Sequence, residues 1–387
     1  MPAEITHPEH LPTRLSRIRG LCLGLALGDA LGNATADERD GSGPLVAGVA
    51  TELAAWSIEG TQRNYVRYGI LHADLVEVGL YGYQRWFEQR GYPEPRLKTW
   101  VPRFLAGFAD GSRPWPNGWL WEDPAMGTGR GKSPTTIAAL QQGRPVRSAG
   151  CQALIRVLPV AAFTQLERPV GASGYSELLG AGDSPYAAYV EMWARNLALL
   201  THDDGESQRL SGLGVRLVAA MLQRSRLTLD DRVRQAVEEP HLVREPMADA
   251  SRRDLVSVLE APRADLSVLR GLAPDTSARS ALLGGLYAAM SFPDVWDVGR
   301  ALDFALRAPD PDSVAAVTGA VLGALFGYEA LPTSLLPRLT HGWTMDRLAI
   351  DLDTSLSGFQ APASWKEGWP SDRPDPDVWW DSKYPGA

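Results

Sequence analysis

The chain has 387 residues, of which 44% are hydrophobic and 22% are charged, and its net charge is -8. These fractions are those of a globular protein with a large core, and the negative charge argues against a surface that wraps nucleic acid or an anionic membrane. The two cysteines are too few for a disulfide framework. The N-terminal segment lacks the apolar run of a signal peptide, and the longest uncharged apolar run, residues 314–328, is too short to span a bilayer. We therefore expect a cytoplasmic protein.

Apolar residues recur at helical spacing along most of the chain, and the alternation typical of strands is scarce. Near the N-terminus Ile18, Leu21, Cys22 and Leu25 fall at i, i+3, i+4 and i+7. Similar patterns predict helices at residues 65–87, 154–163, 186–200, 210–221, 278–290 and 295–308, with Ser277 and Asp294 as N-caps. Loops are expected at residues 37–48, 110–132 and 168–185. The sequence predicts an all-α single domain over residues 14–352, between a polar segment (1–13) and a C-terminal arm (353–387).

Two of the predicted helices carry a glycine at every fourth position: Gly20, Gly24, Gly28 and Gly32 in the first, and Gly319, Gly323 and Gly327 in the second. A glycine inside a helix costs about 1 kcal/mol relative to alanine, so a compensating gain is needed. Residues four apart share one helix face, and glycine there permits close backbone approach. We therefore expect two smooth-faced helices buried at the centre, packed against each other. Packing alone explains this spacing and requires no chemistry.

Two turns rich in small residues precede predicted helices: Gly129-Arg130-Gly131-Lys132-Ser133 and Ser148-Ala149-Gly150-Cys151-Gln152. Free backbone N–H groups at such helix starts can bind an anion. The other interpretation is a plain junction between loop and helix. The first of these turns adds positive charge but lacks the full spacing of a phosphate loop, so a nucleotide triphosphatase is not indicated.

The segment Thr201-His202-Asp203-Asp204 ends one predicted helix and opens the next. His202 is a candidate for ligand contact or proton transfer. The neighbouring carboxylates most simply complement the N-terminus of the following helix. The remaining histidines have no ligand-like spacing, so no zinc site is predicted.

Asp310, Asp312 and Ser313 lie directly ahead of the second glycine-spaced helix. Two carboxylates and a hydroxyl within four residues can converge as oxygen ligands for Mg²⁺ or a similar hard cation. The alternative is local, since aspartate and serine are preferred helix caps and Pro311 suits a turn.

The C-terminal arm differs in composition from the rest of the chain. It contains five prolines and several aromatic residues: Pro362, Pro370, Pro374, Pro376, Pro385, Trp365, Trp369, Trp379, Trp380 and Tyr384. Prolines at this density exclude a regular helix, and four tryptophans are too apolar for a disordered tail. We expect an extended arm packed across the body, the alternatives being a free tail or a docking peptide.

Taken in order, these segments resemble the ADP-ribosylglycohydrolase family, which includes the dinitrogenase reductase-activating glycohydrolases. The resemblance covers roughly residues 14–352 and rests on five motifs: Gly28-Asp29-Ala30-Leu31-Gly32; Gly129-Arg130-Gly131 with Thr135 and Thr136; Gly150-Cys151 with Arg156 and Pro159; Thr201-His202; and Asp310-Pro311-Asp312-Ser313 with Gly319, Gly323 and Gly327. It implies an orthogonal helical bundle with a binuclear Mg²⁺ site that binds ADP-ribose and supports hydrolysis of its bond to a protein side chain.

Several positions depart from the family pattern. The family's TDDT metal motif should fall near residues 56–61, where only Glu59 and Thr61 offer ligands, and the carboxylate that usually follows GDALG is replaced by Ala36. On this basis the catalytic candidates are Glu59 and Asp310. The metal-ligand candidates are Glu59, Thr61, Asp310, Asp312 and Ser313, and the ligand-binding candidates are Asp29, Gly129, Gly131, Ser148, Gly150, Cys151, Gln152 and His202. The reduced ligand number predicts one Mg²⁺ (or Mn²⁺) ion or none, rather than two.

The sequence leaves three functions open. The first is a hydrolase that cleaves an N- or O-glycosidic bond of ADP-ribose in a modified protein or small substrate. The second is an inactive member that binds an ADP-ribose-like ligand or a partner protein, for instance to neutralise a toxin. The third is a lyase or hydrolase recruited to small-molecule metabolism. The expected partners are an ADP-ribosylated protein or an ADP-ribose-like molecule, and neither nucleic acid nor a membrane.

Overall fold

The computed structural model describes residues 11–68, 75–92, 117–165, 187–238, 249–357 and 383–384. Within these ranges the regular structure is helical, and β-pairing is confined to isolated bridges. The α-helices are α1 (Arg14–Asn33), α2 (Ala36–Asp40), α3 (Val49–Tyr68), α4 (Leu75–Gln89), α6 (Trp119–Glu122), α7 (Pro134–Gln142), α8 (Gln152–Ile155), α9 (Ala187–Leu199), α10 (Gly205–Leu222), α11 (Leu229–Glu238), α12 (Asp249–Glu260), α13 (Leu266–Leu272), α14 (Ala278–Ser291), α15 (Val298–Ala305), α16 (Pro311–Phe326) and α17 (Gly342–Leu356). The 3₁₀ helices are η2 (Leu158–Gln165), η4 (Val295–Asp297), η5 (Tyr328–Ala330) and η6 (Leu336–Arg338). The predicted all-α class is confirmed.

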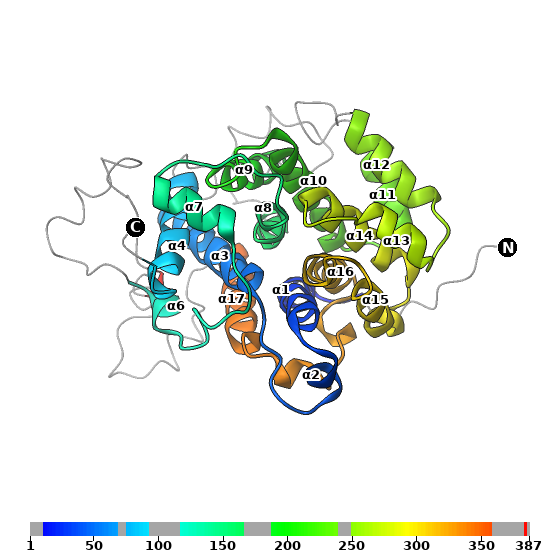
Figure 1. Ribbon diagram of the computed structural model, residues 1–387, viewed down its shortest axis with the longest axis horizontal. Helices are drawn as coiled ribbons and strands as arrows, with labels where there is room; N and C mark the ends of the chain where they lie inside the picture. The colour runs from blue at the N-terminus through cyan, green and yellow to red at the C-terminus, as the bar shows by residue number, and fades with distance from the viewer. Residues whose placement is uncertain are drawn as a thin grey trace, which may run out of the picture.

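Helices α1 and α16 form the centre of the fold and pack along their whole length (Figure 1). Their contact is lined by the two glycine series, and a Cβ atom at Gly20, Gly24 or Gly28 would overlap the backbone of α16. The expectation that the two glycine-spaced helices are buried against each other is confirmed. Close backbone approach therefore offsets the low helix propensity of glycine.

Two groups of helices flank this central pair in Figure 1. The helices α3, α4, α6, α7 and α17 lie on one side, and α10 to α15 lie on the other. Helix α17 packs on α1 and α3, whereas α14 and α15 pack on α16. The start of α16 and the end of α1 are therefore held between the two groups, and this is where the candidate site lies.

The ends of several helices follow from their capping residues. The Ser277 side chain accepts a hydrogen bond from the Ser280 N–H, as expected of an N-cap. Asp294 precedes η4 but its side chain makes no capping hydrogen bond. Residues 295–308 form a short 3₁₀ turn followed by α15, and residues 154–163 divide between α8 and η2, so neither stretch is one continuous helix. The loops expected at 37–48 and 110–132 contain α2 and α6, and the loop at 168–185 lies outside the described residues.

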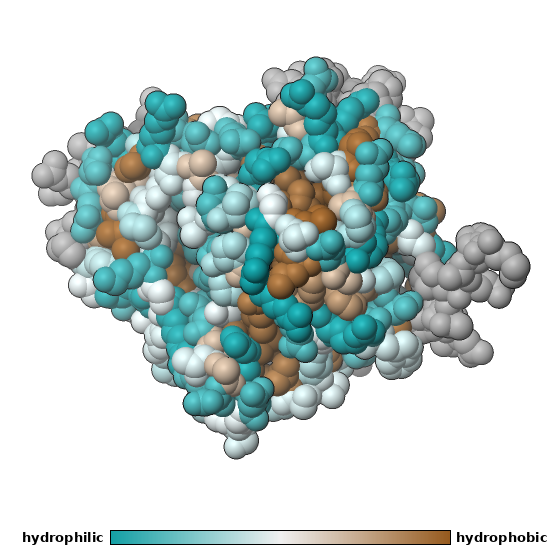
Figure 2. Space-filling view, turned by 45° about the vertical axis from the view of Figure 1, so that its right-hand side comes forward, coloured by the Kyte–Doolittle hydropathy of each residue, from teal (hydrophilic) through white to brown (hydrophobic). Residues whose placement is uncertain are grey.

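Most large apolar side chains in the described ranges are buried. Figure 2 shows hydrophobic residues in a band down the middle of one face, between hydrophilic residues. Among the described residues, the exposed large hydrophobic side chains are Met192, Leu199, Leu227, Trp296 and Trp343. None of the described helices is long and apolar enough to cross a membrane.

The expected start of the C-terminal arm at residue 353 lies inside α17, which continues to Leu356, and beyond residue 357 the described part of the arm is Lys383 and Tyr384. Tyr384 is buried, with 1% of its surface exposed, and its hydroxyl donates a hydrogen bond to Asp351 Oδ2 at 2.6 Å. Lys383 forms an ion pair with the same carboxylate. At these residues the arm packs on α17, and the remainder of its expected path lies outside the described residues.

Candidate functional site

The start of α16 carries two carboxylates and a hydroxyl. Asp310 precedes the helix, Pro311 is its first residue, and Asp312 lies in its first turn. The buried Ser313 hydroxyl contacts Cys151 Sγ at 3.0 Å. Asp310 Oδ2 is buried and has no hydrogen-bond partner among the described residues. Burial and the charge of Asp312 raise the pKa of Asp310 to about 7, so this carboxyl can hold or release a proton near neutral pH.

The end of α1 meets the start of α16 at Asp29 and Gly32. A Cβ atom at Gly32 would overlap the backbone of Asp312. Asp29 Oδ2 accepts hydrogen bonds from the Gly48 N–H (2.9 Å), the Thr51 N–H (2.9 Å) and the Thr51 hydroxyl (2.5 Å). Burial raises the pKa of Asp29 to about 6, and the charge of Asp312 adds to this. Asp29 therefore fixes the start of α3 beside α16.

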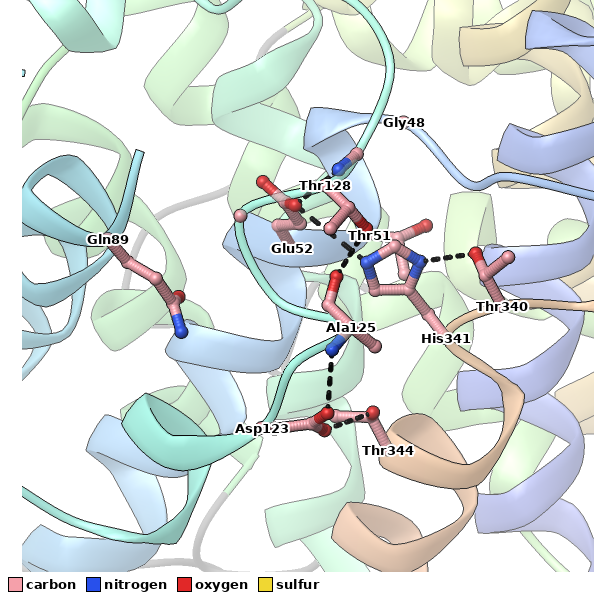
Figure 3. A network of polar contacts seen from close by, with 12 residues as sticks. Gly48, Thr51, Glu52, Gln89, Asp123, Ala125, Thr128, Thr340, His341 and Thr344 are labelled. Carbon is pink, nitrogen blue, oxygen red and sulfur yellow. Dashed lines mark hydrogen bonds and ion pairs between the residues drawn. The ribbon is translucent and has the colours of Figure 1, made fainter. Parts of the chain in front are cut away.

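Glu52, in the first turn of α3, is fully buried within a polar network (Figure 3). Its Oε1 accepts from the Gly129 N–H at 2.6 Å and lies 3.8 Å from His341 Nε2. Its Oε2 accepts from Trp86 Nε1 at 2.8 Å and from Arg90 Nη1 at 3.4 Å. Burial alone would raise the pKa of Glu52, but these donors and the imidazole lower it overall. Glu52 is an ionised carboxylate with both oxygens engaged by the protein.

The same network reaches α17 and the turn after α6. His341 Nδ1 lies 3.0 Å from Thr340 Oγ1. Asp123 accepts hydrogen bonds from the Thr344 hydroxyl and, at 2.9 Å, from the Ala125 N–H (Figure 3). These bonds hold the turn that precedes Gly129 against α17, and so fix the N–H group that binds Glu52.

Ser148, Gly150 and Thr135 form a further polar group beside the start of α8. The Thr135 hydroxyl donates to Ser148 Oγ at 3.0 Å, and the Gly150 N–H donates to the same oxygen at 3.2 Å. The Cys151 N–H donates to the Thr276 carbonyl at 3.0 Å. The N–H groups of Gly150 and Cys151 therefore have intramolecular partners, which favours the plain junction between loop and helix over an anion site at these two groups. The Gly150 N–H stabilises the turn through Ser148, and the Cys151 N–H links the turn to the residue before the N-cap of α14.

His202 is buried and directed toward Gly150. Its Nδ1 lies 2.8 Å from the Thr201 hydroxyl, which also accepts from Arg156 Nη2 at 2.7 Å. Because arginine can only donate, the hydroxyl proton of Thr201 is available to Nδ1, and we assign the proton of the neutral ring to Nε2 on this basis. Burial and the charge of Arg156 lower the pKa of His202 well below its usual value. A Cβ atom at Gly150 would lie 3.5 Å from Nε2, so His202 presents an N–H donor at this turn.

The structure does not bring Glu59 and Thr61 to the carboxylates of α16. Glu59 lies eight residues after Thr51 on α3, or about 12 Å further along the helix. It is buried in an ion pair with Arg63, and Arg85 Nη1 lies 4.0 Å from its other oxygen. The Thr61 hydroxyl donates to the Ser57 carbonyl of its own helix at 2.7 Å. Both candidate ligands are therefore engaged by protein groups, and their role as metal ligands together with Asp310 and Asp312 stays a prediction.

The residues of α3 that lie beside Asp29, near the start of α16, are Thr51 and Glu52, and the sequence analysis did not identify them. One signal was available: both follow a loop and lie in the first turn of a helix, as Asp312 does in α16. The two remaining glycine candidates have structural roles. Gly129 packs directly on Glu52 and Gly48, and Gly131 has a φ of +80°, a conformation that glycine adopts without strain.

Comparison with known proteins gives a family. The model of the ADP-ribosylglycohydrolase family matches residues 10–360. A solved structure described as an ADP-ribosylglycohydrolase-related protein complex is similar with a TM-score of 0.51 and 20% identity, over 89% of this chain and 99% of that chain. At 20% identity, this structural similarity shows that the two chains share a fold. No curated protein sequence matches the chain. Since the family model matches most of the sequence, the chain belongs to the ADP-ribosylglycohydrolase family.

Proposed function

We propose that the chain is a hydrolase that cleaves an N- or O-glycosidic bond of ADP-ribose in a modified protein or small substrate. Members of the family act on ADP-ribosylated substrates. The observation that supports activity here is the carboxylate pair at the start of α16, where Asp310 keeps a buried oxygen without a hydrogen-bond partner among the described residues. Glycoside hydrolysis requires carboxyl groups that move a proton and stabilise positive charge on the sugar. Asp310 and Asp312 are the candidates for both tasks.

The family typically uses divalent metal ions, and the oxygen donors of this chain fit a single ion better than two. No group of three or more histidine, cysteine, aspartate or glutamate side chains in the described ranges is placed to hold a metal. The oxygens of Asp29 and Glu52 are taken up by protein donors. Asp310 and Asp312 remain, with the Ser313 hydroxyl beside them, and would hold one Mg²⁺ or Mn²⁺ ion whose other ligands are water. Such an ion would orient the ribose hydroxyls and the attacking water.

Other residues of the site suit binding rather than proton transfer. His202 stays neutral, because burial disfavours its charged form, and offers its Nε2–H as a donor to a ligand oxygen. The hydroxyls of Thr135 and Ser148 lie close by and bond each other. These groups would position the ligand so that the bond to be cleaved faces the carboxylates of α16.

A second function is favoured by a different observation. The carboxylates of Asp29 and Glu52 both accept hydrogen bonds from other residues of the protein. Glu52 is buried and contacts Trp86, Arg90 and His341 rather than solvent. Because these carboxylates are engaged by protein groups, they are poorly placed to bind a metal ion. This suits a non-catalytic member that binds an ADP-ribose-like ligand or a partner protein. Turnover of an ADP-ribosylated substrate is what separates the hydrolase from the non-catalytic member.

The test combines an activity assay with calorimetry. The wild-type chain is incubated with an ADP-ribosylated protein and with an O-linked ADP-ribose conjugate, with and without Mg²⁺, and released ADP-ribose is measured. Release that is lost in Asp312→Asn and kept in Asp303→Asn, a change to an exposed carboxylate on α15, supports the hydrolase. ADP-ribose binding without release supports the non-catalytic member. If ADP-ribose is neither bound nor released, both the hydrolase and the ligand-binding member are contradicted.

A further inference from the structure

Arg156, the residue that follows α8, is fully buried and bonds three other segments of the chain. Its Nη1 donates to the Thr136 hydroxyl oxygen at 3.2 Å. Its Nη2 donates to the Thr201 hydroxyl oxygen at 2.7 Å and to the Leu197 carbonyl at 2.8 Å. The Cζ atom lies 4.2 Å from the centre of the Tyr83 ring on α4. One buried side chain therefore joins α4, the first turn of α7, and the end of α9 with the turn that follows it.

The bond from Arg156 to Thr201 acts on His202. The Thr201 hydroxyl is fully buried, and its oxygen accepts from Arg156 Nη2 while it lies 2.8 Å from His202 Nδ1. An arginine N–H can only donate, so it turns the hydroxyl proton away from itself and toward Nδ1. Arg156 thereby favours the ring form of His202 that carries its proton on Nε2.

The bond from Arg156 to Thr136 acts on the neighbouring residue, Thr135. It holds the first turn of α7, from which the Thr135 hydroxyl donates to Ser148 Oγ at 3.0 Å. The Gly150 N–H donates to the same oxygen at 3.2 Å. Arg156 therefore also holds the hydroxyl of Thr135 beside that of Ser148.

Both sets of bonds lead to one place, the turn at Gly150. A Cβ atom at Gly150 would lie 3.2 Å from Ser148 Oγ and 3.5 Å from His202 Nε2. These two atoms thus lie on the side of Gly150 where a side chain would project. The hydroxyl and the ring N–H reach this side from different segments, and Arg156 is bonded to both segments.

We propose that Arg156 is a positioning residue for ligand binding, which fixes the His202 Nε2–H and the hydroxyls of Thr135 and Ser148 as donors to ligand oxygens at the Gly150 turn. Arg156 is fully buried and acts through Thr136 and Thr201. Arginine suits this task because its planar group presents several N–H donors in a fixed geometry. Donors that are fixed before binding lose less conformational entropy when the ligand binds. The inference rests on the proposed function, in which the ligand is ADP-ribose or a molecule that contains it.

Nuclear magnetic resonance of the ¹⁵N-labelled histidine ring tests the step from Arg156 to His202 without any ligand. At pH 8, above the usual histidine pKa of about 6.5, the wild type should show a protonated Nε2 and an unprotonated Nδ1, with the signals assigned by their loss in His202→Gln. In Arg156→Met the Thr201 hydroxyl can also accept a proton from Nδ1. The ¹⁵N shifts of the two ring nitrogens should therefore move toward each other.

Calorimetry with ADP-ribose tests the consequence for binding. Arg156→Met should bind ADP-ribose roughly tenfold more weakly than the wild type, because the donors are no longer fixed. Thr136→Val removes only the acceptor on α7, so it should weaken binding about threefold and leave the ring shifts of His202 unchanged.

Arg216→Met is the matched control. Arg216 is also a buried arginine, but it lies on α10 and donates to the Ala236 carbonyl of α11 at 3.2 Å. Its loss should lower stability without changing the ring shifts of His202 or the affinity for ADP-ribose. Urea unfolding of both arginine variants provides the comparison of stability.

The proposal is overturned if wild-type His202 carries its proton on Nδ1, a result that needs no variant. It is also overturned if folded Arg156→Met keeps the wild-type ring shifts, or binds ADP-ribose as tightly as the wild type. Where Arg156→Met does not fold, the wild-type ring shifts and the affinity of Thr136→Val decide, and wild-type affinity in Thr136→Val contradicts the role of the bond to α7. A wild type that does not bind ADP-ribose would contradict the proposed function, whereas the ring shifts would still show whether Arg156 fixes His202.

Discussion

Gly24 of α1 and Gly319 of α16 meet backbone to backbone, and a Cβ atom on either residue would overlap the carbonyl oxygen of the other. The overlapping atoms belong to helix backbones, which cannot turn aside as a flexible side chain can. We expect Gly24→Ala to lower the free energy of unfolding by about 3 kcal/mol. Urea unfolding followed by circular dichroism measures this change.

Gly271→Ala is the control for this prediction. Gly271 lies in α13, and a Cβ atom there would meet nothing within 4 Å. In open space the change from glycine to alanine should stabilise the helix by up to about 1 kcal/mol. If Gly24→Ala were as harmless as Gly271→Ala, the two central helices would not be in backbone contact.

Glu59 supplies the second prediction, because the partners of its carboxylate indicate a structural role. Its carboxylate is fully buried against Arg63, with Arg85 near its second oxygen. Glu59→Gln leaves these arginines without that carboxylate, so we expect a loss of about 3 kcal/mol or more in the free energy of unfolding. The affinity of the remaining folded protein for ADP-ribose, measured by calorimetry, should be unchanged. A large loss of affinity at unchanged stability would instead return Glu59 to the ligand site.

The fold was more predictable from the sequence than the site, and the two glycine series show why. Glycines repeated at every fourth position of a helix are costly unless backbones meet, and this reasoning needs no knowledge of other contacts. Of the seven, six lie inside α1 and α16, and Gly327 ends α16 with a positive φ instead. The site residues on α3 depend on tertiary contacts. Thr51 and Glu59 lie on the same helix, and the sequence does not show which of them is near α16. The hydrogen bonds that Gly48 and Thr51 donate to Asp29 place the start of α3, and therefore Thr51, at this position.

Backbone donors were equally hard to predict. The N–H of Gly129 is taken by Glu52, 77 residues earlier in the chain, and that of Cys151 by the Thr276 carbonyl. A small-residue turn before a helix shows that N–H groups could be free. It does not show whether a distant carboxylate or carbonyl reaches them.

Asp29 gives the third prediction. Its Oδ2 accepts from Gly48 and Thr51, and its Oδ1 accepts from Asn33 Nδ2 at 2.8 Å. An asparagine must direct its NH₂ group at one of these donors, so we expect Asp29→Asn to lower the free energy of unfolding by about 2 kcal/mol. Urea unfolding provides the measurement, and Asp37→Asn on the exposed helix α2 is the control. Equal stability of both variants would show that Asp29 does not hold the start of α3.

His202 gives a prediction that links stability to pH. Burial and the charge of Arg156 place the pKa of His202 well below its usual value in the folded chain, whereas the unfolded chain has a value near 6.5. Below that pH the unfolded state binds a proton that the folded state does not, so this residue's contribution to stability is present above about pH 6.5 and is lost as the pH falls. The difference in unfolding free energy between the wild type and His202→Gln should therefore shrink from pH 8 to pH 5. A difference that stays constant over this range would show that the pKa of His202 is the same in the folded and unfolded states.

Variants at His202 and at its neighbour Thr201 test whether His202 acts as a hydrogen-bond donor to the ligand rather than in proton transfer. A neutral imidazole that donates from Nε2 contributes one hydrogen bond to a ligand, so His202→Ala should weaken ADP-ribose binding roughly tenfold. Thr201→Val removes the hydroxyl that fixes the proton on Nε2, and should weaken binding by a similar factor although it leaves the ring in place. Calorimetry from pH 6.5 to 8 should show wild-type affinity independent of His202 ionisation, because the ring is neutral throughout. If Thr201→Val bound ADP-ribose as tightly as the wild type, the tautomer of His202 would not matter, and its role as a fixed donor would be refuted.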